Sequence, residues 1–285
     1  MKKSSDDDGE QEQEVPKEDA RIHYDKEDLI SFHQLFISKP LTKAALELDY
    51  EHPTVIQRKV IPAILEGNDV LAHSVTGSGK TAAYLLPIME KFIKMRNAKA
   101  ASIGKLRFLV LQPTRELAAQ CYAMLQGLSR YLSAFSSAAV YGGSSLRQQK
   151  RDLESTPDFI VATTGRLLDH VHNTKGFSLE DVEVLVLDEA DRLIEMGFRD
   201  EVTNIVRQCK HPKRQTVMVS ATLNQDLKEL ASMTLKEPLT FTVQQQQRKA
   251  DLANLKLAQY LVRLQFNDVE KRAPRVSRKD RDAGE

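Results

Sequence analysis

The sequence predicts an α/β protein built on one mostly parallel β-sheet with helices on both faces. Three observations predict it: short apolar runs recur along the chain, helical patterns lie between them, and a glycine-rich loop follows the first run. Strands that are buried on both faces have such nearly continuous apolar sequences. Strand and helix alternate in parallel sheets because each parallel connection has to cross back over the sheet.

Each predicted strand ends in small or turn-forming residues. The strands cover residues 69–73, 107–111, 138–141, 159–162, 182–187, 215–219 and 239–243. Helical patterns lie between them at 81–96, 116–133, 146–154, 166–173 and 200–209. Ligands of such folds bind beyond the carboxyl ends of the strands. The motifs described below lie at those ends.

Length and composition exclude several classes of protein. The 285 residues, 41% hydrophobic and 28% charged, suit one large domain, or one domain and a fragment of another. The two cysteines, Cys121 and Cys209, form no CxxC pair and no cluster with histidine, which argues against a disulfide scaffold or a zinc module. The sequence has no apolar run of membrane-spanning length and no signal peptide, so it predicts a soluble intracellular protein.

Charge is unevenly distributed along the chain, although the net charge is only +1. Residues 1–28 contain eleven acidic and five basic residues, and residues 267–285 form a charged tail without apolar periodicity. Both segments are predicted to be disordered, as low hydrophobicity does not support a core. The more basic body between them permits an anionic partner without requiring one.

A phosphate-binding loop is predicted between the first strand and a long helix. It comprises Ser74, Val75, Thr76, Gly77, Ser78, Gly79, Lys80 and Thr81. The glycines let successive backbone N–H groups point at phosphate oxygens, Lys80 supplies a positive charge, and Thr81 offers a hydroxyl to Mg²⁺. Ser74 stands where the strict pattern has Gly or Ala. The alternative is a glycine-rich turn that caps a helix.

Three carboxylates follow the strand at 182–187, within Asp188-Glu-Ala-Asp191. A nucleotide site needs one carboxylate to hold Mg²⁺, largely through water, and a base to orient the attacking water. Asp188 suits the metal because it is the first polar residue after the strand, and Glu189 suits the base. The alternative is an exposed helix start, where acidic residues favour the helix dipole.

These residues, with further motifs in the same order, resemble the DEAD-box ATP-dependent RNA helicases. The resemblance covers roughly residues 31–262 and corresponds to the first RecA-like domain of that family, a three-layer P-loop fold. The matching segments are Asp49–Gln57, which resembles the adenine-reading Q motif, the phosphate loop, Pro113–Leu117, Gly142-Gly143, Thr163–Arg166, Asp188–Asp191 and Ser220–Thr222. The helicase domain is accordingly expected over residues 29–247.

The resemblance implies a role for each motif in ATP and RNA binding. Gln57 is expected to contact the adenine edge with its amide, and Tyr50 and Phe32 occupy positions of aromatic residues near the base. For Gln57 the alternative is an exposed helical glutamine, and for Phe32 it is core packing. Lys80, Asp188 and Glu189 are the expected catalytic residues, with ATP and Mg²⁺ as substrate and cofactor.

The resemblance also implies an RNA backbone groove without sequence specificity. The residues expected to line it are Pro113, Thr114, Arg115, Gly142, Gly143, Thr164, Gly165 and Arg166. Arg115 could equally be an ion-pair partner at a helix start. Thr164 stands where the family usually has proline, which is expected to loosen this segment.

The hydroxyls of Ser220 and Thr222 are expected to bond to Asp191 and to couple the ATP state to RNA unwinding. The alternative is a Ser/Thr turn that enters a helix at Asn224.

Residues 248–266 resemble the linker and the first strand of a second RecA-like domain. The family carries its arginine fingers in that domain, so this chain is expected to be nearly inactive alone. One interpretation is therefore the ATP-binding lobe of an RNA helicase, expected to be monomeric. The other is a truncated, non-catalytic lobe that binds nucleotide and a partner protein.

The segment 157–170 resembles nucleolar helicases of large-ribosomal-subunit assembly, and the acidic leader suits them. Pre-ribosomal particles are then expected partners, and the nucleus or nucleolus the expected location, with the cytoplasm as the alternative.

Overall fold

The computed structural model describes residues 30–97 and 105–243. The predictions made for residues 1–28, 248–266 and 267–285 lie outside the described residues. The chain forms a seven-stranded sheet in the order β3-β4-β2-β5-β6-β1-β7, and every strand pair in it is parallel. This confirms the predicted fold class.

The seven predicted strands are confirmed, with ends that differ by at most two residues. They are β1 (Val70–Ser74), β2 (Phe108–Gln112), β3 (Ser137–Val140), β4 (Phe159–Thr163), β5 (Val184–Leu187), β6 (Gln215–Ser220) and β7 (Leu239–Val243). Strands β2, β5 and β6 are buried along their whole length, as their continuous apolar sequences predict.

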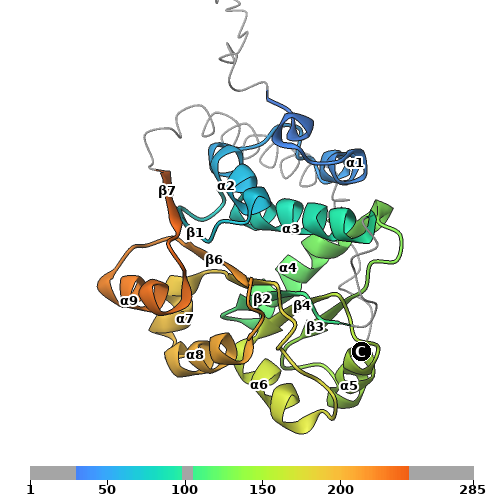
Figure 1. The fold of residues 1–285 in the computed structure, drawn as a ribbon, viewed down its shortest axis with the longest axis vertical. Coiled ribbons are helices and arrows are strands. Elements are labelled where there is room, and N and C mark those ends of the chain that lie inside the picture. Colours follow the sequence, from blue (N-terminus) through green and yellow to red (C-terminus); the bar gives the residue numbers. More distant parts are fainter. Residues whose placement is uncertain (1–29, 98–104, 244–285) are drawn as a thin grey trace, which may run out of the picture.

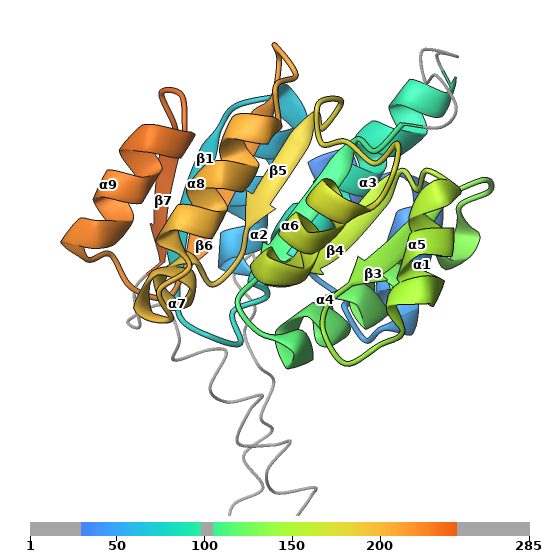
Figure 2. The ribbon, with the colours of Figure 1, turned by 90° about the horizontal axis from the view of Figure 1, so that it is seen from below.

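Helices cover both faces of the sheet (Figures 1 and 2). One face carries α1 (Lys39–Glu47), α2 (Val55–Glu66), α3 (Lys80–Asn97) and α4 (Arg115–Leu128). The other carries α5 (Leu146–Glu154), α6 (Thr164–Asn173), α7 (Ala190–Glu195), α8 (Arg199–Gln208) and α9 (Gln225–Thr234). Short 3₁₀ turns lie at Phe32–Leu35 and Ser129–Tyr131. No helix of the described ranges is long and apolar enough to cross a membrane.

Two N-terminal helices, α1 and α2, were not among the predicted elements. Helix α2 begins at Thr54 with a capping box formed with Gln57 and ends at Gly67, whose φ of 96° suits glycine. Phe32 precedes α1 and is fully buried in the core, in agreement with the core-packing alternative for this residue.

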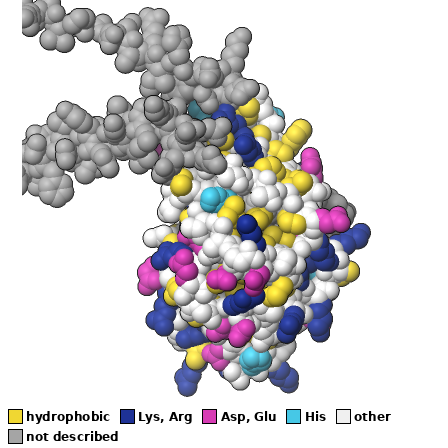
Figure 3. Space-filling model, turned by 90° about the vertical axis from the view of Figure 1, so that its left-hand side faces the viewer, with side chains coloured by type: hydrophobic (Ala, Val, Ile, Leu, Met, Phe, Trp, Pro, Cys, Tyr) yellow, Lys and Arg dark blue, Asp and Glu magenta, His cyan; other side chains and the backbone are white. Residues whose placement is uncertain are grey.

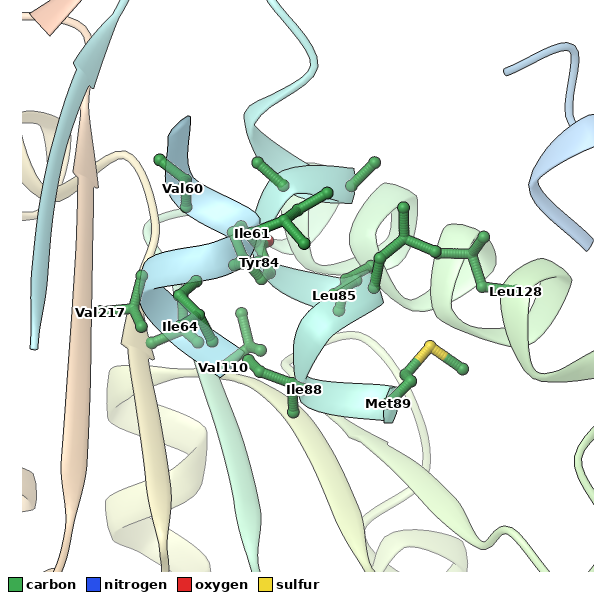
Figure 4. Packing of buried hydrophobic residues seen from close by; sticks show 14 of the residues in the cluster. Val60, Ile61, Ile64, Tyr84, Leu85, Ile88, Met89, Val110, Leu128 and Val217 are labelled. Carbon is green, nitrogen blue, oxygen red and sulfur yellow. The ribbon is translucent and has the colours of Figure 1, made fainter. Parts of the chain in front are cut away.

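The tightest packing on this face joins α2 and α3 to the sheet. Figure 4 shows Ile61 and Ile64 of α2 beside Tyr84, Leu85 and Ile88 of α3, above strand residues of the sheet. All five side chains are at most 1% exposed. Because α3 begins at Lys80, this apolar contact holds the start of the helix, and with it the phosphate loop, over the sheet.

Figure 3 shows the side of the molecule that carries β7 and α9. Acidic and basic side chains are interspersed over it, so it has no large patch of one charge sign. Electrostatic attraction for a polyanion needs clustered basic residues. That side therefore has no such cluster.

Replacing Ile61 with alanine should destabilise the domain by about 2–5 kcal/mol, because it leaves a cavity between α2 and α3. Urea unfolding followed by circular dichroism measures the change. Leu46→Ala is the control: Leu46 is 50% exposed, so its truncation should cost less than about 0.5 kcal/mol. Equal losses for the two variants would show that the α2–α3 contact is not a main source of stability.

Candidate nucleotide and nucleic-acid sites

The phosphate loop occupies the turn between β1 and α3, as predicted. Gly77 and Gly79 have φ values of 78° and 90°, a region that side chains with a Cβ rarely adopt. A Cβ at Gly77 would meet no atom within 4 Å, so the loop leaves open space on that side. The hydroxyls of Ser74 and Ser78 are buried and have no hydrogen-bond partner among the described residues.

The start of α2 holds the other side of the phosphate loop. The Thr54 hydroxyl donates to the Ser78 carbonyl at 2.9 Å, and the Gln57 amide donates to the Gly79 carbonyl at 3.0 Å. A Cβ at Gly79 would lie 2.5 Å from Gln57 Nε2, so only glycine permits this approach. The two helices thereby fix the loop from both ends.

The alternative considered for Gln57, an exposed glutamine on a helix, is wrong because the side chain is buried. The side chain is 2% exposed, and its carbonyl oxygen accepts from the Thr54 backbone N–H at 2.9 Å. Both ends of the amide are thus used inside the protein. Contact with adenine requires Gln57 to exchange at least one of these bonds, so that role stays a prediction.

Lys80 is 6% exposed at the first turn of α3. Its Nζ donates to the Ser74 carbonyl at 2.7 Å and lies 3.9 Å from Glu189 Oε1. The positive charge is thus shared between the phosphate loop and the acidic segment. Lys80 thus connects the phosphate loop to the acidic segment.

The acidic segment turns sharply at the end of β5. Glu189 has φ 47° and ψ 48°, an unusual left-handed conformation for this residue type, and α7 starts directly after it. This turn separates Asp188, which is 4% exposed, from the more accessible Glu189. Burial raises the pKa of the Glu189 carboxyl, and the charge of Lys80 opposes that rise.

Asp188 is surrounded by hydrogen-bond donors. Tyr84 Oη and Gln112 Nε2 each donate to Asp188 Oδ2 at 2.8 Å, and the Glu189 backbone N–H donates to Oδ1 at 2.9 Å. Burial raises the pKa of Asp188, while the bonds from Tyr84 and Gln112 lower it. Burial also raises the pKa of the neighbouring Cys121 thiol to about 12, so the thiol stays protonated.

A cavity of about 340 Å³ joins the phosphate loop to the acidic segment. Predicted residues that line it are Tyr50, Thr76, Gly77, Gly79, Lys80, Thr81, Asp188 and Glu189. Ser74, Val75, Ser78 and Gln57 lie outside its lining. The sequence interpretation missed Ala82, Gln112, Leu117, Gln120, Cys121 and Met124. The last four share one face of α4 at helical spacing, which was a usable signal, since that helix was predicted.

Asp191 joins the acidic segment to the loop after β6. The Thr222 hydroxyl and backbone N–H both donate to Asp191 Oδ2 at 2.9 Å. The Ser220 hydroxyl instead donates to the Thr222 carbonyl at 2.8 Å. The expectation that both hydroxyls bond to Asp191 is therefore correct for Thr222 and wrong for Ser220, because the Ser220 bond stabilises the turn itself.

A second hollow, a groove of about 540 Å³, lies beyond β2, β3 and β4. Every residue expected in the RNA groove lines it except Gly143. Glu116 and Thr163, which belong to the same matching segments, line it as well, and so do Met196 and Phe198, which no motif predicts. Met196 and Phe198 come from the turn between α7 and α8, which a motif search along the sequence does not place here.

Two arginines of this groove are held by neighbouring elements, one by a loop and one by helix α5. A Cβ at Gly142 would lie 2.7 Å from Arg115 Nε, so the Arg115 guanidinium packs on the Gly142 backbone. Among the described residues Arg115 forms no salt bridge, contrary to the ion-pair alternative. Arg166 donates to Gln149 Oε1 at 3.1 Å, and Gln149 Nε2 donates to the Tyr141 carbonyl at 2.8 Å.

Thr164 is the first residue of α6 and is 2% exposed. The position suits proline because its missing N–H would be unpaired there anyway. The loosening expected from the missing proline at Thr164 therefore concerns the first turn of α6, which is packed in the protein interior.

The structure places a phosphate loop opposite two carboxylates at the carboxyl edge of a parallel sheet. The fold and the site are those of a P-loop nucleotide-binding domain. The model of the DEAD/DEAH box helicase family matches residues 54–230, and the chain belongs to that family.

Individual relatives agree with this assignment. The chain is 45% identical over 218 residues to a probable ATP-dependent RNA helicase, ddx27, of Dictyostelium discoideum, which covers 76% of this chain and 27% of the relative. It is 42% identical over 238 residues to the ATP-dependent RNA helicase DRS1 of Meyerozyma guilliermondii, covering 84% of this chain and 33% of the relative. The chain therefore spans about a quarter to a third of these curated relatives.

A solved structure supports the fold. The crystal structure of a DEAD box protein from the hyperthermophile Methanococcus jannaschii superposes with a TM-score of 0.67 at 29% identity. The match covers 75% of this chain and 56% of the other. It confirms the RecA-like P-loop architecture that the sequence motifs imply.

Gly79→Ala should destabilise the protein more than Gly77→Ala. Both substitutions force a positive φ on alanine, at about 1 kcal/mol each. Only Gly79→Ala also displaces the Gln57 amide, which should cost about 1 kcal/mol more. Thermal or urea unfolding without nucleotide measures both. A Gly77→Ala variant as unstable as Gly79→Ala would show that the Gln57 contact does not hold the loop.

Proposed function

We propose that this chain is the ATP-binding domain of an RNA helicase, in which ATP binding and hydrolysis are coupled to RNA binding and remodelling. The observation that supports it best is one cavity lined by the phosphate loop, Asp188 and Glu189, next to a groove lined by the predicted RNA contacts. The domain is proposed to extend over residues 29–247, with the acidic leader before it and a linker after it.

In this proposal the phosphates of ATP bind the backbone N–H groups of residues 76–81. Lys80 moves from the Ser74 carbonyl to the phosphates, which it can reach because Lys80 and residues 76, 77, 79 and 81 of the phosphate loop line the same cavity. Tyr50, whose hydroxyl lies 4.0 Å from Met124 Sδ, lines the same cavity and contacts the base. Glu189 orients the attacking water, a role that suits a carboxylate whose pKa burial has raised.

The residues present fit a magnesium ion. The described residues contain no cluster of three or more His, Cys, Asp or Glu side chains that could hold a metal ion on their own. Mg²⁺ in nucleotide sites is bound through one or two protein groups, phosphates and waters, and Thr81 and Asp188 supply such a pair on the cavity wall. When bound, the ion neutralises charge on the phosphates during transfer.

The groove beside β2, β3 and β4 is the proposed RNA site. Arg115 and Arg166 are pre-arranged by Gly142 and Gln149, and the threonines and glycines around them offer small donors to a backbone. Such contacts read phosphate and sugar without sequence specificity. Binding is therefore expected to weaken steeply with salt.

The second candidate is a lobe that binds nucleotide and a partner protein without catalysis. It is favoured by the lining of the nucleotide cavity, which contains no arginine among the described residues. An arginine finger contributes about 10³–10⁵ to phosphoryl transfer, so residues 30–243 alone are expected to hydrolyse ATP slowly. We propose a monomeric chain for both candidates.

We further propose a role in ribosome biogenesis, with pre-ribosomal particles as partners and the nucleolus as location. Two observations support this: the relatives named ddx27 and DRS1, and an acidic leader of eleven acidic against five basic residues. Association with ribosome precursors in sucrose gradients tests it, and sedimentation apart from all such particles would contradict it.

The full chain should bind ADP in the presence of Mg²⁺ and prefer it to GDP. Lys80→Ala should weaken binding at least about tenfold, because the phosphates lose a buried cation worth more than about 1.4 kcal/mol. Isothermal titration calorimetry measures both. Lys105→Ala is the control, since Lys105 pairs with Asp181 on the surface. Equal affinity for GDP would contradict the adenine assignment.

Glu189→Gln should abolish hydrolysis while nucleotide binding persists, since the amide keeps the shape but removes the base. RNA-stimulated phosphate release is measured for the chain alone and for the chain fused to a second helicase domain. The helicase proposal expects strong stimulation only in the fusion. If the fusion also stays at background with nucleotide bound, the non-catalytic lobe is the better interpretation. Near-normal turnover in Glu189→Gln would exclude Glu189 as the base.

A further inference from the structure

A buried polar cluster lies behind the acidic segment, formed by Tyr84 of α3, Gln112 at the end of β2 and Cys121 of α4. Tyr84 is fully buried and Gln112 is 2% exposed. The Tyr84 hydroxyl is 3.3 Å from Cys121 Sγ, and Gln112 Nε2 is 3.4 Å from the Tyr84 hydroxyl. None of these side chains belongs to a motif that the sequence interpretation assigned.

The cluster converges on one atom, Asp188 Oδ2. Tyr84 and Gln112 both donate to it at 2.8 Å, although they come from different elements. Two donors on one oxygen fix the rotation of the carboxylate about its Cβ–Cγ bond. The other oxygen, Oδ1, is then kept on the side of the Glu189 backbone N–H.

Burying these polar groups is costly without such partners. An apolar side chain could fill the space around Tyr84, which lies in a hydrophobic core of α2 and α3 (Figure 4). Gln112 uses only its donor end, because its Oε1 is buried without a hydrogen-bond partner among the described residues. The amide therefore donates to Asp188 Oδ2 at 2.8 Å and, over a longer distance, to the Tyr84 hydroxyl at 3.4 Å.

We propose that Tyr84 and Gln112 are positioning residues that hold Asp188 in the orientation in which it accepts Mg²⁺ or its bound water. The inference rests on the proposed ATP site and names two residues that act through Asp188. Partners behind a metal ligand orient it, and losing one typically costs about 10–100-fold in metal affinity. A purely structural role predicts instead a loss of folding stability with metal dependence unchanged.

The test measures ADP affinity of the full 285-residue chain against Mg²⁺ concentration, and again in EDTA. Tyr84→Phe removes only the hydroxyl, and Gln112→Met keeps the length but removes the donor. Each should raise the Mg²⁺ concentration for half-maximal effect about tenfold, and Tyr84→Phe, which lies outside the cavity lining, should leave the affinity in EDTA unchanged. Asp188→Asn is the reference for a lost ligand and should nearly abolish the Mg²⁺ effect.

Matched controls come from helix α4. Tyr122→Phe removes a hydroxyl that donates to the Ser137 carbonyl, and Gln126→Met removes an amide that donates to the Ser137 hydroxyl. Neither residue lines the nucleotide cavity. Both variants should keep the wild-type Mg²⁺ dependence. Thermal unfolding of every variant separates folding from binding.

The outcomes distinguish the inference from the function on which it rests. A wild-type chain whose ADP affinity ignores Mg²⁺ overturns the metal assignment, and the inference with it. A Mg²⁺ effect that persists unchanged in Tyr84→Phe and Gln112→Met overturns the inference alone. Equal losses with Mg²⁺ and in EDTA would also overturn it, because they indicate a distorted pocket. A shift confined to the Mg²⁺ dependence supports it.

Discussion

The parallel hydrogen-bond ladder of the sheet is the constraint on which the rest of the structure depends. Because β1, β2, β5 and β6 run in the same direction, their last residues meet at one edge. That edge brings Ser74, Gln112, Asp188 and Ser220 together from positions up to 146 residues apart. The apolar interior of the strands supplies the driving force, and the polar site occurs only where the strands stop.

The sequence predicted the sheet well for a physical reason. A strand such as β5 is buried on both faces, so its residues must be apolar throughout and the pattern is local. Helices α1 and α2 lack such a distinct signal, since their packing against α3 and the phosphate loop decides their position. The helix predicted at 116–133 is longer than the observed one, because α4 ends at Leu128 and the chain turns into a 3₁₀ segment at Ser129.

The candidate site was predictable where a motif is contiguous and less so where it depends on tertiary contacts. Lys80, Asp188 and Glu189 belong to contiguous motifs, and they do line one cavity. Gln57 also belongs to such a motif, yet its amide bonds to Gly79, a contact that local pattern does not specify. From the sequence alone, Tyr84 is interpreted as a core residue of an amphipathic helix. Only the fold places its hydroxyl on Asp188.

One residue connects the two hollows of the domain. Gln112 lines the nucleotide cavity and bonds to Asp188, whereas the next residue, Pro113, lines the groove of the predicted RNA contacts. Across the sheet Gln112 pairs with Thr163, which lines the same groove. The Gln112 side chain therefore links Asp188 to a backbone position next to the groove. The bond between Thr222 and Asp191 gives the acidic segment a second link, on the opposite side of β5. The buried carboxylates are thus bonded to residues at strand ends on both sides of β5.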